Sequence, residues 1–279
     1  MRVESGMTVA IGGLGTSSHP MALIREVIRA RTTDLVVVAG PMASLEVDLM
    51  IAAGCVAEVV SSYVGGERLA PIGPAYRRAV EQGEVRIREV DEGVYCQALG
   101  AAARMLPFAT WRGGVGTDLP TFNDQLVLID DPFGGPPVLA VKALPIDVAL
   151  IHADAADMYG NVQPHGTGFG DRLHAAAADL TIVQVERVIS NEEVRRAPWL
   201  TSLPDADVIV RAPFGAHPYS SPGHYVEDEQ HLREYVVAAT AGGAALDDYV
   251  DQFVREPADH VDYCTRIGLR RLLQLGEYA

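Results

Sequence analysis

The sequence predicts a single α/β domain, spanning residues 1–279, with a mainly parallel sheet and helices on both of its faces. Three observations support this prediction. Short apolar runs alternate with amphipathic segments over the first hundred residues, and three further apolar runs follow residue 146. The 279 residues contain no internal repeat, low-complexity stretch or long linker that would mark a second domain. Strands that alternate with helices in this way are typical of parallel sheets.

The first hundred residues give four strands and four helices. The runs predicted as strands are 7–13, 34–40, 57–65 and 84–90. The segments predicted as helices are 20–30, 45–55, 73–83 and 94–106. In the first of these helices Leu23, Val27 and Ile28 share one face. Gly83 stands where a helix that ends in a glycine cap is expected to stop.

The pattern changes between residues 107 and 145, where proline, glycine and aspartate are frequent. We expect loops and short antiparallel strands there, with a hairpin around 134–137. Buried strands resume at 147–153, 180–186 and 207–213. The tail, from about residue 228 to 279, is predicted to be helical.

Composition excludes several classes of function. Twenty-two basic and 37 acidic residues give a net charge of −15, which argues against nucleic acid and anionic membranes as partners. No apolar stretch reaches about 18 residues, so no membrane span is expected. The start, MRVESG, is not typical of a signal peptide. Three scattered cysteines form no metal motif and favour a reducing compartment, so we expect a cytoplasmic protein.

Two glycine-rich turns follow predicted strands. The first, IGGLGTSSHP, contains what we call the glycine loop, residues 12–16. It is not a dinucleotide fingerprint, because Ser18 stands where the third glycine is needed and no acid follows the second strand. Its backbone amides could hold an anion or an oxyanion, although a closely packed turn is equally compatible. The second, WRGGVGTD at 111–118, could face the same crevice, although an ordinary surface loop is favoured when it is taken alone.

The candidate acids and histidines have structural alternatives. Glu92, beside Asp91 at the start of a predicted helix, could be a general base or nucleophile, but helix-start acids are common. The stretch HADAADMYGNVQ, 152–163, is better explained as a turn than as a metal site. His217 and His224 lack partners at metal-ligand spacing and are expected to be structural. The missing GxSxG motif argues against a serine hydrolase.

Taken together, these motifs resemble the alpha subunit of class I coenzyme A transferases along nearly the whole chain, and most closely the glutaconate coenzyme A-transferase group. The matching stretches, in chain order, are GGLGTSSHP, TDL before the second strand, LPF at 106–108, IDVALIHADAADMYGNV, TIVQVERVISNEEVRR, APFGAHP and DHVDYCTRIGLRRLLQL. The ordered series is specific, above all ISNEEVRR together with APFGAHP.

The resemblance implies a three-layer α/β/α fold and a beta subunit of similar fold, in an α2β2 assembly with the active site between subunits. A glutamate of the beta subunit would attack the acyl-CoA thioester, giving an anhydride and then an enzyme–CoA thioester. Coenzyme A would enter as part of the substrate, and no metal or bound cofactor is expected. The candidate substrate or coenzyme A contacts of this chain are Gly12, Gly13, Leu14, Gly15, Thr16, Arg112, Gly114 and Gly116.

A second branch of the same fold, the ring-opening hydrolase of steroid catabolism, gives the alternative. That branch lacks the beta-subunit glutamate and is associated with an alpha-subunit glutamate in a DEG stretch. Glu92 falls on that position, as the candidate base, and Arg112 on an arginine typical of the branch. Both groups carry basic residues where this chain has Ser17 and Ser18. A third possibility is that the chain only shapes a catalytic partner.

Overall fold

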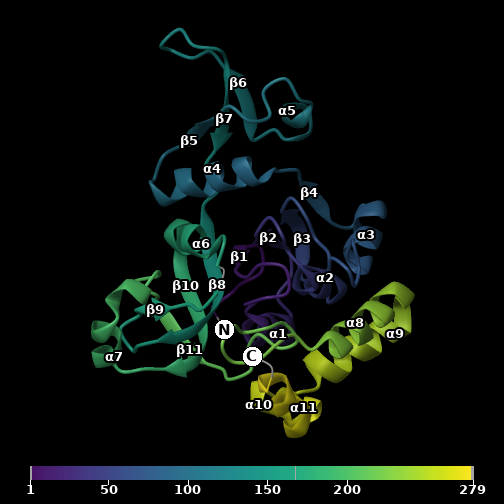
Figure 1. Ribbon diagram of the computed structural model, residues 1–279. Coiled ribbons are helices and arrows are strands. Elements are labelled where there is room, and N and C mark those ends of the chain that lie inside the picture. Colours follow the sequence, from purple (N-terminus) through teal and green to yellow (C-terminus); the bar gives the residue numbers. More distant parts are fainter. Residues whose placement is uncertain (1, 167, 278–279) are drawn as a thin grey trace.

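The computed structural model describes residues 2–166 and 168–277 and is built on an eight-stranded sheet (Figure 1). Its strands are β1 (Thr8–Ile11), β2 (Leu35–Ala39), β3 (Val56–Val60), β4 (Arg86–Arg88), β8 (Ile146–Ala156), β9 (Val162–Gln163), β10 (Ala178–Val188) and β11 (Val208–Arg211). Their order is β11-β10-β8-β1-β2-β3-β4, and every neighbouring pair in it is parallel. Only β9 is antiparallel, against β8. The predicted α/β fold with a mainly parallel sheet is confirmed.

Helices cover both faces of this sheet. One face, which includes Val9 and Val37, packs against α1 (Met21–Arg29), α2 (Leu45–Ala52), α3 (Pro74–Glu81), α8 (Glu229–Ala241) and α9 (Gly243–Val250). The other face, which includes Ala10 and Val38, packs against α4 (Glu92–Ala103) and α6 (Asp171–Ala177). Because neighbouring strand residues point to opposite faces, each short strand supplies both apolar cores.

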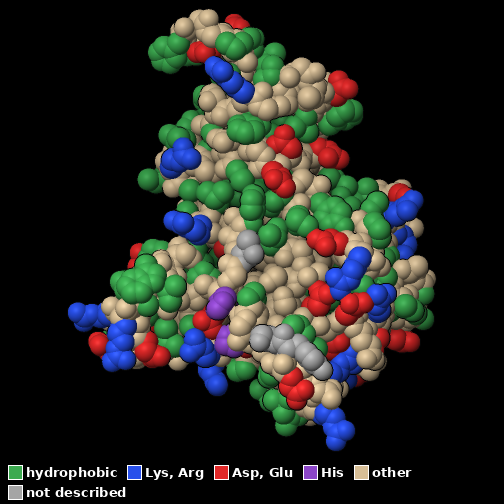
Figure 2. Space-filling model, in the orientation of Figure 1, with side chains coloured by type: hydrophobic (Ala, Val, Ile, Leu, Met, Phe, Trp, Pro, Cys, Tyr) green, Lys and Arg blue, Asp and Glu red, His purple; other side chains and the backbone are tan. Residues whose placement is uncertain are grey.

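A second, smaller sheet lies beyond α4 and projects from the body of the molecule (Figure 1). This projecting sheet contains β5 (Phe108–Trp111), β6 (Leu126–Ile129) and β7 (Val138–Lys142), all antiparallel, with the short helix α5 (Leu119–Phe122) beside it. The β6–β7 connection contains residues 134–137, so the predicted hairpin is present. Figure 2 shows hydrophobic side chains on the surface of this region, and Phe133 at the hairpin is 95% exposed.

The C-terminal part of the chain is helical from Glu229 onward, with α8 and α9 followed by a π-helical turn (Asp251–Arg255), α10 (His260–Ile267) and α11 (Leu269–Gly276). The fully buried Arg25 of α1 anchors this part. Its guanidinium donates to the His217 carbonyl at 3.1 Å and lies 3.6 Å from the centre of the Tyr263 ring. Within the described residues, no helix is long and apolar enough to cross a membrane.

Three local expectations needed correction. The strand expected at 57–65 ends at Val60, where the chain turns into a loop. The stretch 152–163 is not simply a turn, because His152 and Asp154 lie in β8 and only 157–160 reverse the chain. Three helices were not predicted, namely α5, α6 and α7 (Asn191–Arg196).

The strand order places a topological switch point between β1 and β8. From β1 the chain builds the sheet through β2, β3 and β4, whereas β8, β10 and β11 extend it in the opposite direction. Ligands of open α/β sheets bind outside the carboxyl ends of the strands at such a point. Ile11, the last residue of β1, pairs with Leu150, and β8 continues six residues further to Ala156. The glycine loop therefore emerges beside the overhanging end of β8.

Candidate active site at the switch point

The glycine loop is held by hydrogen bonds to the protein itself. Gly12 N–H donates to the Leu150 carbonyl at 2.9 Å, and Gly13 N–H donates to Asp171 Oδ1 at 3.1 Å. Leu14 exchanges two 3.0 Å hydrogen bonds with Ser17, and Gly15 N–H donates to the Met42 carbonyl at 3.0 Å. Four of the five amides expected to approach a substrate thus already have protein acceptors.

The glycines of this loop make room for two buried side chains. A Cβ atom on Gly12 would lie 2.5 Å from Asp171 Oδ1, and one on Gly13 would lie 2.7 Å from His19 Nδ1. Gly13 and Gly15 also have φ values of +100° and +59°, which L-residues with side chains rarely adopt. The backbone therefore comes close to Asp171 and His19, and this close approach accounts for the glycine spacing.

Thr16 differs from the four residues before it. Its carbonyl accepts from both the amide and the hydroxyl of Ser220 at 3.0 Å, which fixes the peptide. Its own amide and hydroxyl have no hydrogen-bond partner within residues 2–166 and 168–277. Since the residue is only half-buried, Thr16 keeps two donors that can reach a ligand.

The N-terminus of α1, which follows the loop, is closed by protein groups. Ala22 N–H donates to the Gly215 carbonyl at 2.9 Å, and Leu23 N–H donates to Gln184 Oε1 at 3.1 Å. Exposed amides at a helix start attract anions, but these two are already satisfied. Anion binding at this helix start is therefore not favoured.

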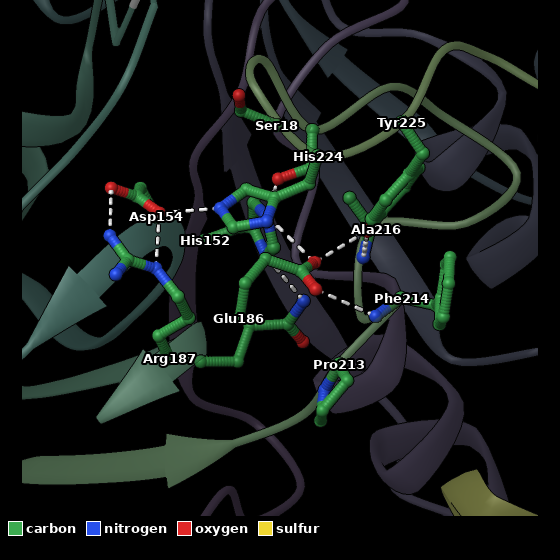
Figure 3. Close-up of polar contacts among 12 residues, drawn as sticks. Ser18, His152, Asp154, Glu186, Arg187, Pro213, Phe214, Ala216, His224 and Tyr225 are labelled. Carbon is green, nitrogen blue, oxygen red and sulfur yellow. Dashed lines mark hydrogen bonds and ion pairs between the residues drawn. The ribbon is translucent and has the colours of Figure 1, made fainter. Parts of the chain in front are cut away.

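A buried polar group, which we call the His152 cluster, fills the region beside the overhanging end of β8 (Figure 3). It consists of His152, Gln184, Glu186, Ser221 and Tyr225. The Leu23 amide fixes Gln184 Oε1 as an acceptor, so Gln184 Nε2 donates to His152 Nδ1 at 2.8 Å. His152 Nε2 consequently carries the proton and points at Ser221 Oγ, 2.9 Å away.

This tautomer argues against a serine nucleophile, although serine, histidine and glutamate lie together. His152 donates to Ser221 and cannot withdraw its proton, and Glu186 Oε1 is 3.6 Å from the same Nε2 atom. Burial lowers the pKa of His152 to about 3, which keeps the ring neutral. Glu186 instead accepts from Tyr225 at 2.6 Å and from the Phe214 amide at 2.7 Å (Figure 3). The cluster holds segment 212–226 against β8 and β10.

Asp154 forms the solvent-facing rim of this region. It accepts from Arg187 Nη2 at 3.2 Å and from His224 (Figure 3). Burial by itself would raise the pKa of Asp154, but the hydrogen bonds from Arg187 and His224 lower it overall. His217, by contrast, is fully buried between Tyr263 and Asp228, so its expected structural role is confirmed.

Glu92 and Arg112 each stand next in sequence to a glycine that packs against Trp111. Asp91 caps α4, since its Oδ1 accepts the Val94 amide at 2.6 Å, and Glu92 is exposed in the first turn. The Trp111 indole packs so tightly against Gly93 and Gly113 that a Cβ on either glycine would overlap the ring. Glu92 precedes one of these glycines and the exposed Arg112 precedes the other.

The other two glycines of the second turn form its bends. Gly114 and Gly116 have φ values of +77° and +83°, and a Cβ on Gly116 would meet open space. Within the part of the chain that the structure describes, no hydrogen bond or ion pair joins Glu92 or Arg112 directly to the glycine loop. The structure therefore brings the predicted residues together as two groups, one at each side of α6.

Helix α6 supplies the link that sequence reasoning missed. Asp171, at its start, holds the Gly13 amide, and His174 in its second turn is hydrogen-bonded to the Tyr95 hydroxyl of α4. Burial raises the pKa of Asp171 to about 6 and lowers that of His174 to about 4. No local motif marks these residues, because their partners lie far away in the sequence.

We expect Gly93→Ala to displace the Trp111 ring and to disturb the Arg112 turn with it. The new methyl group would occupy the position of the indole, and overpacking of this kind costs about 1–3 kcal/mol. In a Trp199→Phe background Trp111 is the single tryptophan of the sequence, and the tryptophan emission should move to longer wavelength in the Gly93→Ala variant. Unchanged emission would contradict the packing of Trp111 between the two glycines.

No group of three or more histidine, cysteine, aspartate or glutamate side chains in the described ranges is arranged to hold a metal ion.

Comparison with known proteins gives a consistent set of relatives. The family model for coenzyme A transferase matches residues 1–210. An uncharacterized protein of Archaeoglobus fulgidus is 37% identical over 99% of this chain, which spans only 63% of that protein.

Two further relatives have names that state an activity. The cholesterol ring-cleaving hydrolase IpdA subunit of Rhodococcus jostii is 35% identical over 85% of this chain and 83% of its own length. A glutaconate CoA-transferase subunit of Acidaminococcus fermentans is 32% identical over 98% of this chain and 90% of its own length. The crystal structure of glutaconate coenzyme A-transferase from that organism matches with a TM-score of 0.93, at 31% identity, over 98% of this chain and 91% of its own.

Proposed function

Because this chain belongs to the coenzyme A transferase family, we propose that it is the alpha-type subunit of a heteromeric enzyme that transfers coenzyme A from an acyl-CoA to a carboxylic acid. The observation that carries the proposal is the agreement with the glutaconate coenzyme A-transferase structure over nearly the whole chain. A beta-type subunit is its partner, as the subunit names of the relatives imply. We further propose one domain, an α2β2 assembly and a cytoplasmic location, with coenzyme A entering only as part of the substrate.

In this proposal the chain contributes the groups that hold the reacting carbonyl. The glutamate nucleophile belongs to the beta subunit, and Thr16 faces the thioester from this side. Its free amide and hydroxyl would donate to the carbonyl oxygen as negative charge develops there. The neighbouring amides serve a different purpose, since their protein acceptors keep the loop rigid. Arg112, with the turn through Gly114 and Gly116, would contact the coenzyme A part.

The ring-cleaving hydrolase is the second candidate, and the position of Glu92 favours it. Glu92 is exposed at the start of α4, beside the contact between Trp111 and Gly93, and free to meet a substrate. In this reaction Glu92 would take a proton from water, and the hydroxide would add to a ring carbonyl. Collapse of the adduct would break the adjacent carbon–carbon bond and leave a carboxylate, and the protonated Glu92 would return its proton to the departing carbon.

One assay separates the two candidates. The complex with the beta subunit is supplied with acetyl-CoA or succinyl-CoA, with and without glutaconate or 3-oxoadipate, and acyl exchange is followed by mass. We expect exchange that requires the acceptor acid and survives Glu92→Ala. Turnover of a cyclic acyl-CoA with the gain of one water, independent of acceptor and lost in Glu92→Ala, would instead establish the hydrolase.

Replacement of Thr16 by valine tests the role of the glycine loop. The change keeps size and shape but removes one of the two proposed donors, so we expect kcat for exchange to fall about 10- to 100-fold with little change in KM. Ser17→Ala is the matched control, because the Ser17 hydroxyl contacts only Ser18 Oγ, at 3.2 Å, among the described side chains. Equal activity of the two variants would remove Thr16 from the proposed site.

A further inference from the structure

Helix α6 is bonded both to the glycine loop and to α4, the helix that begins at Glu92. At one end, Asp171 Oδ1 accepts the Gly13 amide at 3.1 Å. One turn later, His174 Nε2 is hydrogen-bonded to the Tyr95 hydroxyl. All three side chains are buried, with exposed fractions of 3% for Asp171, 0% for His174 and 1% for Tyr95. These contacts therefore belong to the interior and are not screened by solvent.

The surroundings of Asp171 show a site built around its carboxyl group. Its Oδ1 atom lies 2.5 Å from the position of a Cβ on Gly12, and its Oδ2 atom lies 2.7 Å from that of a Cβ on Gly168. Any side chain at either position would overlap the carboxyl group. Two glycines from distant parts of the chain thus leave space for one acidic side chain.

A gain in folding stability does not explain why an acidic side chain is buried at position 171. Among the residues that the structure describes, Asp171 is fully buried with one backbone hydrogen bond, and a buried carboxyl with so few donors is unfavourable. Asp48 provides the comparison, because it is equally buried but accepts from the Tyr76 amide at 2.6 Å and from the Tyr235 hydroxyl at 2.5 Å. Asp48 ties helices together, whereas Asp171 holds one peptide of the glycine loop.

The contact with Asp171 sets the direction of that peptide. Because a peptide is planar and trans, drawing the Gly13 N–H toward Asp171 turns the Gly12 carbonyl the opposite way. The next amides then reach Ser17 and Met42, and Thr16 follows three residues after Gly13. Without Asp171 this peptide would be free to rotate, and glycine offers little resistance to rotation.

The middle of α6, at His174, acts on the helix that begins with Glu92. Tyr95 lies three residues after Glu92, so the two residues are neighbours on adjacent turns of α4. The hydrogen bond between Tyr95 and His174 fixes the first turn of α4 against α6. The Trp111 contact at Gly93 then places the Arg112 turn relative to the same helix.

We propose that Asp171 and His174 are positioning residues that hold the glycine loop and the start of α4 at one fixed separation, so that Thr16 and Arg112 meet the same acyl-CoA. This proposal rests on the proposed function for its catalytic consequence. The structural part, control of the Gly13 peptide by Asp171, stands without it. Neither residue needs to touch the substrate.

The test uses the complex with the beta subunit and two variants, Asp171→Ala and Asp171→Asn. In Asp171→Ala, hydrogen exchange of the Gly13 amide should rise about 10-fold, which corresponds to the loss of one hydrogen bond of about 1.4 kcal/mol. With acetyl-CoA and glutaconate, kcat should fall about 10- to 100-fold while KM stays within about 3-fold. The reason is that a displaced glycine loop moves Thr16 relative to the reacting carbonyl. Asp171→Asn keeps an acceptor oxygen and should restore both protection and kcat.

Asp48→Asn is the matched control, with an equally buried carboxyl group whose hydrogen bonds go to Tyr76 and Tyr235 rather than to the loop. It should leave Gly13 exchange and kcat unchanged. The proposal is overturned by unchanged Gly13 exchange in Asp171→Ala, or by a kcat that stays low in Asp171→Asn although Gly13 is protected. Tyr95→Phe, which changes little volume, covers the case in which Asp171→Ala does not fold and should also lower kcat more than KM. If the wild-type complex exchanges no acyl group, the proposed function fails, but the exchange result for Gly13 still decides the positioning.

Discussion

Gly12→Ala is expected to destabilise the chain by about 1–3 kcal/mol and to lower Tm by about 2–4 °C for each kcal/mol. The new Cβ would lie 2.5 Å from Asp171 Oδ1, which has no free space into which to retreat because Gly168 borders its other oxygen. The Gly12 backbone cannot shift either without breaking its hydrogen bond to Leu150. Thermal denaturation measures the effect, and the displaced loop should lower acyl exchange as well.

Gly100→Ala is the control for this prediction. Gly100 lies within α4, and a Cβ there would meet only the end of the flexible Arg104 side chain, at 3.1 Å. Alanine favours the helix, so the free energy of unfolding of this variant should rise by about 0.5–1 kcal/mol. Combining Gly12→Ala with Asp171→Ser should cost less than the sum of the two changes, because the shorter side chain relieves the overlap. Strict additivity would contradict the contact.

The chain is expected to lose stability steeply as the pH falls from about 6.5 toward 4. Burial lowers the pKa of His152 to about 3, and those of His174, His217 and His260 to about 4. In this window the unfolded histidines bind protons and the folded ones do not, so stability rises with pH. Each buried histidine contributes a slope of about 1.4 kcal/mol per pH unit.

Three buried carboxyl groups oppose this loss without cancelling it. Burial raises the pKa of Asp48 and of Asp171 to about 6 from 3.8 and also raises that of Glu186, so these groups bind protons more readily in the folded state and favour folding as the pH falls. Urea unfolding at pH 7.5, 6.5, 5.5 and 4.5 measures the free energy of unfolding at each pH. Its slope is about 1.4 kcal/mol per pH unit for each proton by which the unfolded and folded states differ. His260→Gln keeps a donor for the Pro213 carbonyl and should show a shallower slope. A flat profile for the wild-type chain would contradict the prediction.

The sequence predicts the regular elements well because their patterns are local. The strands β1, β2 and β10 and the helices α1 and α4 follow from apolar spacing alone, and the cap at Asp91 follows from its position before a helix. Helix α6 was missed because its seven residues, DRLHAAA, carry no apolar period and follow a glycine-rich stretch. Residues 154–156 fall outside the strand predicted at 147–153, because the sequence ADAAD at 153–157 gives no strand signal. Pairing with β10 across the sheet extends β8 through them.

The candidate site is less predictable for the same reason. The glycines mark a close backbone approach, but the sequence does not reveal that Asp171 and His19 are what approaches. The same glycine spacing is equally compatible with the close approach of a bound acyl group. Likewise, Thr16 becomes distinct from Gly12 to Gly15 only when the acceptors of their amides are known. The roles of Glu92 and Arg112 stay predictions until the partner and substrate are supplied.

The contact between Gly13 and Asp171 also has a consequence for the order of events at the ribosome. The two residues are 158 positions apart, and Leu150, which bonds Gly12, is nearly as distant. At a translation rate of about 5–20 residues per second, some 8–30 s separate synthesis of the loop from synthesis of the side chain that fixes it. The nascent chain therefore carries an unfinished loop for most of its elongation, and the loop is completed only after α6 and then Ser220 have been synthesised.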